Sequence, residues 1–359
     1  MNRKAREIAP MLRGLSFNGE KGDIVVCKDS IDYAELTCTA EELPEKFEKG
    51  MRSVIVEGAG AFLLGEDYDD AVNGTSNAIK LEGRAAVVHN KVCVVTGGAQ
   101  GFGEGIVRSL IQNGALVFIA DMNVGGAKKL AQDLNEQAGR TVAFGVAVNV
   151  TDEDSVKGMV DEVVKTTGGI DLFVSNAGVL KAGSVKELSL KDFEFVTDVN
   201  YVGFFLCTKH AAPVMELMNK PQGNYYTDIV SISSKSALEG SNKNGAYAGS
   251  KFGSVGLVQS FAKELVVDNT KVNTVCPGNF FDGPLWSDPE RGLFVQYLNT
   301  GKVPGAKTIE DVRRFYEAQI PMNRGCDGED VTKAIMYSVE QKYETGQAIP
   351  VTGGQVMLN

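Results

Sequence analysis

The segment VCVVTGGAQGFG, residues 92–103, joins an apolar run to a glycine-rich turn. The run is β-branched and carries no charge, as is typical of a strand that is buried on both faces of a parallel sheet. Gly97, Gly101 and Gly103 follow at the spacing of a turn that leads from a strand into a helix. A Cβ in such a turn would block positive φ and hold the backbone amides away from a pyrophosphate. The segment therefore predicts a dinucleotide-binding unit.

The alternation of short apolar runs with longer helical stretches continues from residue 91 to the C-terminus. It is typical of βαβ units, in which helices join parallel strands. The predicted strands are 92–96, 116–121, 141–146, 172–175, 228–231, 271–276 and 347–351. The predicted helices are 103–113, 125–138, 152–166, 190–218 and 247–267, with Thr151 as the N-cap of the third. The fold class is therefore α/β, a Rossmann doubly wound parallel sheet of about seven strands.

Residues 1–88 differ from the rest and predict a small α+β N-terminal appendage ahead of a dinucleotide-binding domain at 89–359. Within the appendage, β-branched runs at 23–27 and 53–56 predict strands, and the proline-free stretch 68–81 predicts a helix. The acidic run DYDD at 67–70 is expected to be a solvated surface.

Residues 279–321 interrupt the alternation with Pro284, Pro289 and Pro304. A long irregular insertion beside a sheet is often a substrate lid, and this is our prediction for the segment. A helix is expected to begin inside it near Thr308, because Asp311 stands at the spacing of a capping box.

Composition excludes several classes of function. The 359 residues carry 36 basic and 46 acidic side chains, a formal charge of −10, which argues against a nucleic-acid binder. No apolar run approaches the roughly 18 to 20 residues of a membrane span, so we expect a cytoplasmic protein with no membrane partner. The six cysteines form no Cys-x-x-Cys pair and are expected to be free thiols. The two histidines, His89 and His210, stand far apart, so no metal site is predicted.

Asp121 ends the second predicted strand, about twenty residues after the glycine turn. A carboxylate at this position can accept hydrogen bonds from both hydroxyls of an adenosine ribose and would repel a 2′-phosphate. Neither Met122 nor Asn123 adds a cation that could compensate such a phosphate. NAD, rather than NADP, is therefore the predicted cofactor.

Tyr247 is the only tyrosine in the chain with a lysine four residues later, Lys251. This spacing puts both side chains on one face of a helix. A phenol with a pKa near 10 is a poor base at neutral pH, and a nearby ammonium lowers that pKa. We therefore predict that Tyr247 exchanges a proton with an alcohol, and that Ser234, at the end of a predicted strand, donates to the substrate oxygen.

Together these motifs resemble the short-chain dehydrogenase/reductase family over about residues 90–359. The matching segments are Thr96-Gly97-x-x-x-Gly101-x-Gly103, Asn176-Ala177-Gly178, Asn200, Ser234, Tyr247-x-x-x-Lys251 and Pro277-Gly278. The resemblance implies that Tyr247 is the acid/base, that Lys251 lowers its pKa and binds the nicotinamide ribose, that Ser234 orients the substrate, and that Asn200 holds a water in a proton relay. It also implies cofactor contacts from Phe102, Asn149, Val150, Asn176, Ala177, Gly178, Pro277 and Gly278.

Two positions depart from the family pattern. Asn149 stands where the family usually has an aspartate beside the adenine. After Pro277-Gly278, where the family often has a threonine that contacts the carboxamide, this chain continues Asn279-Phe280-Phe281-Asp282. The contacts to the adenine and to the carboxamide are therefore expected to differ locally.

Within the family, segments 251–257, 323–327 and 351–357 are similar to the sorbitol-6-phosphate 2-dehydrogenases. This likeness implies hydride transfer to NAD with interconversion of D-sorbitol 6-phosphate and fructose 6-phosphate. The expected substrate contacts are Lys181, Lys235, Ser236, Lys243 and Asn279, with Arg324 as a further cation. Two alternatives stay open: a related dehydrogenase for another sugar alcohol or hydroxyl compound, and a non-catalytic dinucleotide-binding sensor. The family also implies a homodimer or homotetramer.

Residues 53–62, SVIVEGAGAF, resemble the last portion of a class II aldolase domain. Aldolase chemistry of that class depends on metal-binding histidines, and residues 1–88 contain none. The appendage is therefore predicted to be structural, covering a sheet edge or joining a subunit interface.

Overall fold

The computed structural model describes residues 3–76, 79, 81–290, 292–299, 301 and 303–357. Its larger sheet is wholly parallel, in the order β11-β10-β9-β8-β5-β6-β7. The strands are β5 (Val92–Thr96), β6 (Leu116–Asp121), β7 (Ala143–Ala147), β8 (Leu172–Ser175), β9 (Thr227–Ile232), β10 (Thr270–Pro277) and β11 (Ala348–Val351). All seven predicted strands are confirmed. The strand order reverses between β5 and β8, which is where doubly wound sheets bind their ligands.

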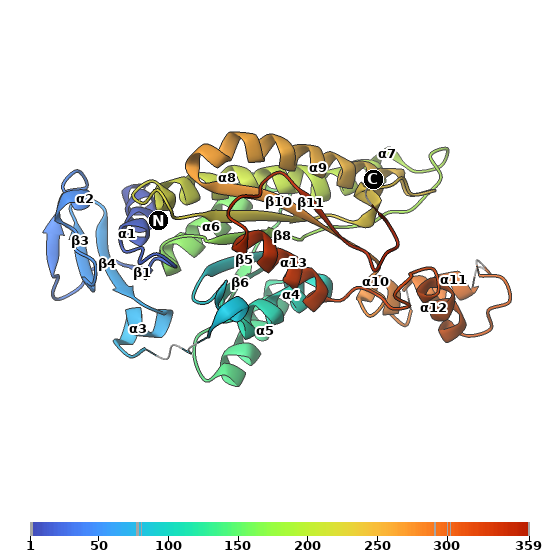
Figure 1. Cartoon of the computed structure of the whole chain (residues 1–359), viewed down its shortest axis with the longest axis horizontal. Helices are drawn as coiled ribbons and strands as arrows, with labels where there is room; N and C mark the ends of the chain where they lie inside the picture. The colour runs from blue at the N-terminus through green and yellow to red at the C-terminus, as the bar shows by residue number, and fades with distance from the viewer. Residues whose placement is uncertain are drawn as a thin grey trace.

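Helices cover both faces of this sheet (Figure 1). They are α4 (Gly101–Gln112), α5 (Val124–Ala138), α6 (Glu153–Thr167), α7 (Leu190–Thr197), α8 (Gly203–Asn219), α9 (Gly245–Leu265) and α13 (Gly328–Glu340). The side chains of α6, α8 and α9 share one apolar core with one face of the sheet, and those of α4, α5 and α13 share another with the opposite face. Among the described residues, no helix is long and apolar enough to cross a membrane.

Two of the helix predictions were wrong in detail. The N-cap of α6 is Asp152, whose side chain accepts from the amide of Ser155, whereas Thr151 donates to the side chain of Asn149. The predicted helix 190–218 is divided into α7 and α8 by a π-helical turn, Asp198–Val202. The π turn lies between two α-helices without a capping side chain or a proline, so no stop signal in the sequence reveals it.

The N-terminal appendage has an α+β fold, as predicted. Its sheet has the order β1-β4-β3-β2, formed by β1 (Ile24–Lys28), β2 (Leu36–Cys38), β3 (Ser53–Val56) and β4 (Gly60–Gly65), with helices α1 (Arg3–Leu15), α2 (Leu43–Lys46) and α3 (Tyr68–Asn73). The predicted helix 68–81 is too long, because Gly74 adopts φ +69° and ends α3 with a left-handed cap. Residues 77, 78 and 80 of that prediction lie outside the described residues.

The appendage and the large sheet share a single apolar core that includes Leu12 of α1, Phe173 of β8 and Met218 of α8. At its centre, the fully buried Arg13 donates from Nη2 to Oδ2 of Asp171 at 2.5 Å. The same carboxylate accepts the hydroxyl of Tyr225 at 2.5 Å and the amide of Val92 at 2.7 Å. Helix α1 is therefore bonded directly to the start of the neighbouring strands β5 and β8.

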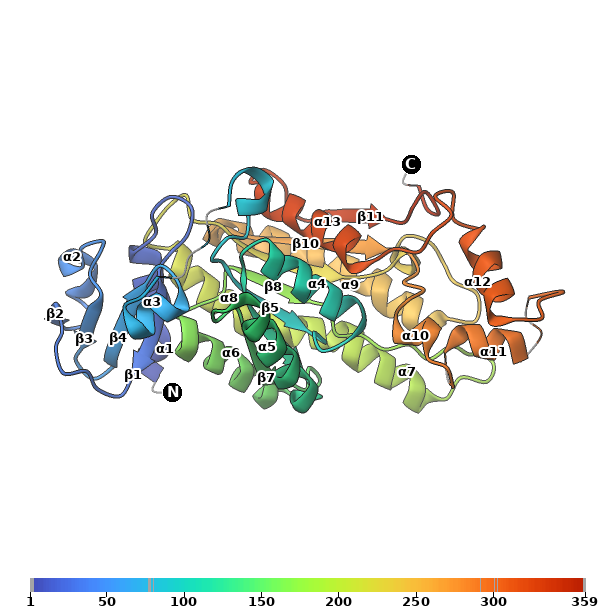
Figure 2. The same cartoon turned by 90° about the horizontal axis from the view of Figure 1, so that it is seen from below.

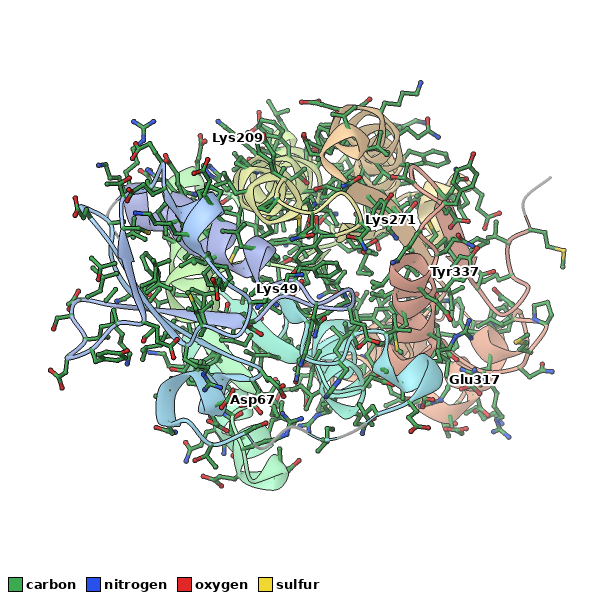
Figure 3. All side chains as sticks on the ribbon, turned by 60° about the vertical axis from the view of Figure 1, so that its left-hand side comes forward. Lys49, Asp67, Lys209, Lys271, Glu317 and Tyr337 are labelled. Carbon is green, nitrogen blue, oxygen red and sulfur yellow. The ribbon has the colours of Figure 1, made fainter. Side chains whose placement is uncertain are left out.

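The acidic run 67–70 is not the solvated surface that its composition predicted. Asp67 begins α3 and accepts the amide of Asp70 (Figure 3). Asp70 is buried and pairs with Arg52 at 2.8 Å. Asp69 accepts the amide and the hydroxyl of Thr141, beside β7, at 3.0 and 2.7 Å. These carboxylates cap α3 and connect it to the edge of the large sheet.

The insertion at 279–321 lies at the end of the molecule opposite the appendage (Figures 1 and 2). It is less irregular than predicted, since it contains α10 (Pro284–Ser287), α11 (Leu293–Asn299) and α12 (Ile309–Glu317). Phe281, Trp286, Phe294, Val303, Val312 and Ile320 form an apolar core of its own. The predicted capping box of Thr308 and Asp311 is confirmed at the start of α12.

Candidate active site

The glycine turn between β5 and α4 has the predicted conformation. Gly97 and Gly101 adopt φ +63° and +62°, in the left-handed region that side chains rarely occupy. A Cβ on Gly103 would lie 2.0 Å from the carbonyl oxygen of Gly97, so no side chain fits between the turn and the first turn of α4. The amides at the start of α4 have no intrahelical partner, and such amides favour a phosphate. The turn is therefore shaped for the pyrophosphate of a dinucleotide.

Thr96 and Asn176 hold this turn against the end of β8. The Oγ1 of Thr96 accepts the amides of Asn176 and Ala177 at 3.0 and 3.1 Å. In return, Nδ2 of Asn176 donates to the carbonyls of Thr96 and Gly97 at 2.9 and 3.2 Å. Four hydrogen bonds thus connect the two strands at the point where the sheet order reverses.

Asp121 lies at the end of β6, next to the glycine turn. Its two carboxylate oxygens accept the amides of Ala99 and Asn123 at 3.1 and 2.8 Å. These bonds fix the carboxylate and leave lone pairs that a ribose can use.

The two expected adenine contacts differ in their surroundings. Oδ1 of Asn149 accepts hydrogen bonds from Thr151 within its own turn, and Val150 is buried beside Gly203 of α8.

Tyr247 and Lys251 lie on the same face of α9, as their spacing predicted. The Nζ of Lys251 is 5.7 Å from the centre of the Tyr247 ring and donates to the carbonyl of Ile232 at 2.8 Å. Ser234 follows β9, and its hydroxyl acts to lower the pKa of the Tyr247 phenol. The end of β9 and the first turns of α9 therefore bring the three predicted catalytic side chains together.

Burial controls the protonation of this pair. It raises the pKa of Tyr247, and the hydroxyl of Ser234 opposes that rise. Burial also lowers the pKa of Lys251 to about 8. In this structure burial dominates the pKa of the phenol and raises it, and a lowering of that pKa by the ammonium of Lys251 stays a prediction.

Asn200 lies in the π-helical turn between α7 and α8 and is buried. Its Oδ1 accepts the amide of Val179 at 2.8 Å, and its Nδ2 donates to the carbonyl of Val179 and to the hydroxyl of Ser250 at 3.0 and 3.1 Å. A Cβ on Gly178 would lie 3.3 Å from Oδ1 of Asn200 and 3.5 Å from Nζ of Lys251. Gly178, Asn200 and Lys251 thus converge, as a proton relay requires.

The three lysines expected to contact substrate lie on segments that flank Tyr247. The loops of Lys181 and Lys243 are joined by a hydrogen bond of 2.8 Å from the amide of Gly183 to the carbonyl of Lys243. Lys181 is 4.0 Å from Asp192, and Lys235 is 3.9 Å from Glu239. Burial lowers the pKa of Lys235.

The remaining substrate candidates differ from one another. Ser236 is buried, and its amide donates to the hydroxyl of Ser234. Asn279 and Arg324 line a cavity of about 490 Å³ beside Gly278. The guanidinium of Arg324 bonds both oxygens of Asp330, at 2.5 and 2.9 Å, so a phosphate would compete with that carboxylate.

Sequence reasoning missed one contact near the cofactor turn. The ring of Phe280 stacks on Phe102, with centroids 4.5 Å apart and planes at 21°. The departure from the family pattern after Pro277-Gly278 was the available signal, but it did not reveal which side chain the phenylalanine meets.

The profile of the family described as short chain dehydrogenase matches residues 91–286, more than half of the chain. The chain belongs to this family. Relatives of this short-chain dehydrogenase include the sorbitol-6-phosphate 2-dehydrogenase of Escherichia coli (strain K12), 35% identical over 271 residues that cover 75% of this chain and 100% of the relative. A 3-oxoacyl-[acyl-carrier-protein] reductase of Thermotoga maritima is 31% identical over 272 residues, 75% of this chain and 99% of the relative.

A solved structure shows the same architecture. The sorbitol-6-phosphate 2-dehydrogenase from Erwinia amylovora matches this short-chain dehydrogenase with a TM-score of 0.68 and 36% identity, over 74% of this chain and 100% of that one. About a quarter of the present chain is therefore not covered by the match.

Proposed function

We propose that this short-chain dehydrogenase is an NAD-dependent oxidoreductase that interconverts D-sorbitol 6-phosphate and fructose 6-phosphate, working as a homodimer or homotetramer. The observation that carries the proposal is the convergence of Ser234, Tyr247, Lys251 and Asn200 next to the glycine turn. The likeness to the enzymes of Escherichia coli and Erwinia amylovora, at 35% and 36% identity over their full length, supports the choice of substrate.

The residues present fit a dinucleotide. A side chain would fill the cradle at Gly97, Gly101 and Gly103, and the glycines leave it open. Asp121 would bind the adenosine ribose and Lys251 the other ribose. NAD, when bound, supplies the acceptor for a hydride. Because Asp121 would repel a 2′-phosphate, we expect NADP to be a poor substitute.

The chain's own residues handle the proton. The hydroxyl of Ser234 holds the C2 oxygen of the substrate, and the phenolate of Tyr247 takes the proton of the substrate's C2 hydroxyl as the C2 hydrogen departs as hydride. In the reverse direction, Tyr247 returns the proton to the carbonyl oxygen. Lys251 and a water held near Asn200 then exchange this proton with solvent.

The phosphate is proposed to bind at the loops of Lys181 and Lys243, with Lys235 nearby. The hydrogen bond between Gly183 and Lys243 holds the two loops together, which supports the choice of these two lysines. Lysines at a rim bind a phosphate as point charges and gain little from a neighbouring carboxylate in water.

The test is an assay with sorbitol 6-phosphate and sorbitol, each with NAD and with NADP. We expect turnover with the phosphate ester and NAD, and a fall in kcat of at least about a hundredfold in Tyr247→Phe with NADH binding retained. Tyr337→Phe, on α13 (Figure 3), is the matched control and should keep full activity, because its hydroxyl bonds only Glu344 among the described residues.

A second candidate is a related dehydrogenase for another hydroxyl compound. The relative from Thermotoga maritima, whose name gives a different substrate, favours keeping this candidate. Equal turnover of sorbitol and its 6-phosphate would contradict the phosphate assignment. Binding of NADH without turnover of any hydroxyl compound would contradict the enzyme assignment as a whole.

A further inference from the structure

The glycine turn and the insertion meet at two points. Phe102, the second residue of α4, stacks on Phe280 with ring centroids 4.5 Å apart. A Cβ on Gly101 would lie 3.7 Å from Cδ of Pro284, at the start of α10. The turn that is shaped for a pyrophosphate is therefore in contact with the first residues of the insertion.

Phe281 leads from this contact into the core of the insertion. Its ring is buried and lies 4.9 Å from that of Trp286, edge to face, and 5.7 Å from that of Phe294. Trp286 in turn packs 5.1 Å from Phe294. We call Phe281, Trp286 and Phe294 the aromatic core. Because Phe280 and Phe281 are adjacent in the chain, a ring stacked on the cofactor turn is joined by one peptide bond to this core.

An ion pair joins the segment that carries Phe280 to α12. Asp282 bonds Arg313 of α12 at 2.8 Å, and the same guanidinium lies 6.0 Å over the ring of Phe294. The backbone next to Phe280 is thereby joined to α12, which gives a displacement of the Phe280 ring a contiguous path to the core.

We propose that Phe280 is a positioning residue for the dinucleotide: through its stack on Phe102 it couples occupancy of the glycine turn to the aromatic core of the insertion. The inference rests on the proposed function only in taking NAD as the ligand. Since coupling between two sites is reciprocal, packing of the core also strengthens dinucleotide binding. An aromatic pair of this kind corresponds to roughly a two- to tenfold change in affinity.

Trp286 makes the coupling measurable, because it is the only tryptophan in the chain. The full-length protein is titrated with NAD while tryptophan emission is followed, and binding of NAD is measured in parallel by calorimetry. For the wild type we expect a saturable change in emission with the same midpoint as the calorimetric curve. Phe280→Ala should bind NAD roughly two- to tenfold more weakly and lose most of the emission change.

Matched variants separate coupling from general damage. Phe315→Ala alters a ring of α12 that is 42% exposed and packs on Tyr316, so it should keep both the affinity and the emission change. Phe280→Tyr keeps the stacked ring and should behave as wild type, and Phe280→Leu, which keeps apolar bulk, replaces Phe280→Ala if the latter does not fold.

The outcomes are distinguishable. Wild-type binding of NAD with no change in tryptophan emission overturns this inference alone, as does an undiminished emission change in both Phe280→Ala and Phe280→Leu. If calorimetry detects no binding of NAD by the folded wild type, both this inference and the proposed function are overturned.

Discussion

Lys251 has its amine buried beside the Tyr247 ring, bonded to the carbonyl of Ile232. Burial lowers the pKa of this amine from 10.5 to about 8, so the folded chain binds its proton less readily than the unfolded chain does. Such a group makes the free energy of unfolding rise with pH between the two pKa values. The residue that the chemistry needs is therefore one that weakens the fold at neutral pH.

We expect Lys251→Met to change how stability depends on pH. Between about pH 8 and 10.5 the wild type should gain up to about 3 kcal/mol relative to the variant, since each pH unit is worth about 1.4 kcal/mol. Urea unfolding of both proteins at several pH values in this range measures the difference. Parallel plots of the free energy of unfolding against pH for the two proteins would show that burial does not lower the pKa of the amine.

Tyr247 predicts opposite pH profiles for the two directions of the reaction. Burial raises the pKa of its phenol, so at neutral pH the phenol holds its proton. Alcohol oxidation needs the phenolate and should fall about tenfold for each pH unit below the pKa, whereas ketone reduction needs the phenol and should fall only as pH rises. Profiles of kcat in both directions check this, and profiles of the same slope would contradict it.

At the scale of single elements, the junction of β5 with α4 has no room for a side chain at Gly103. Gly103 and Gly256 are both glycines inside helices, but their surroundings differ. A Cβ on Gly103 would lie 2.0 Å from the carbonyl oxygen of Gly97, whereas a Cβ on Gly256 of α9 would meet no described atom within 4 Å beyond the neighbouring backbone of its own helix.

We therefore expect Gly103→Ala to abolish measurable binding of NADH by displacing the glycine turn. Gly256→Ala should bind NADH normally and be more stable by about 0.5–1 kcal/mol, because alanine is the better helix former. Calorimetric titration and thermal unfolding of both variants measure these effects. Normal NADH binding by Gly103→Ala would mean that the turn can shift without loss of its function.

The elements of the large sheet were predictable because its strands are continuous apolar runs that end at glycine or at polar residues. Helix α1 was not predicted, since Pro10 lies inside it and Arg13, on its buried face, disguises the apolar pattern. Helix α13 was not predicted either, although Asp327 and Asp330 form a capping box at its start. The site residues followed from spacing, but the Phe102–Phe280 contact did not, because it joins segments with no shared periodicity.

At the scale of the whole molecule, the pair of Arg13 and Asp171 joins residues that are 158 positions apart. Spacing rules cannot predict such a pair, since they compare near neighbours in the chain. Removing one partner leaves the other as an uncompensated buried charge, which typically costs 3–5 kcal/mol. The appendage is therefore expected to support the stability of the central strands as well as its own.

We expect Arg13→Met to lower the free energy of unfolding by about 3–5 kcal/mol. Arg6→Met is the matched control on the same helix, because Arg6 pairs with Asp161 where both side chains are 27% exposed, and it should cost less than about 1 kcal/mol. Urea unfolding measures both. An equal decrease in the free energy of unfolding in both variants would show that the buried pair contributes no more to stability than the exposed pair.

The common core of the two sheets determines how the protein responds to truncation and to cleavage of its backbone. A gene shortened to start at residue 89 would expose the apolar faces of α6 and α8 that α1 covers, and would leave Asp171 without its cation. By contrast, a single break in the backbone between α3 and β5 should leave both pieces held together, so that they purify as one particle until denaturant separates them.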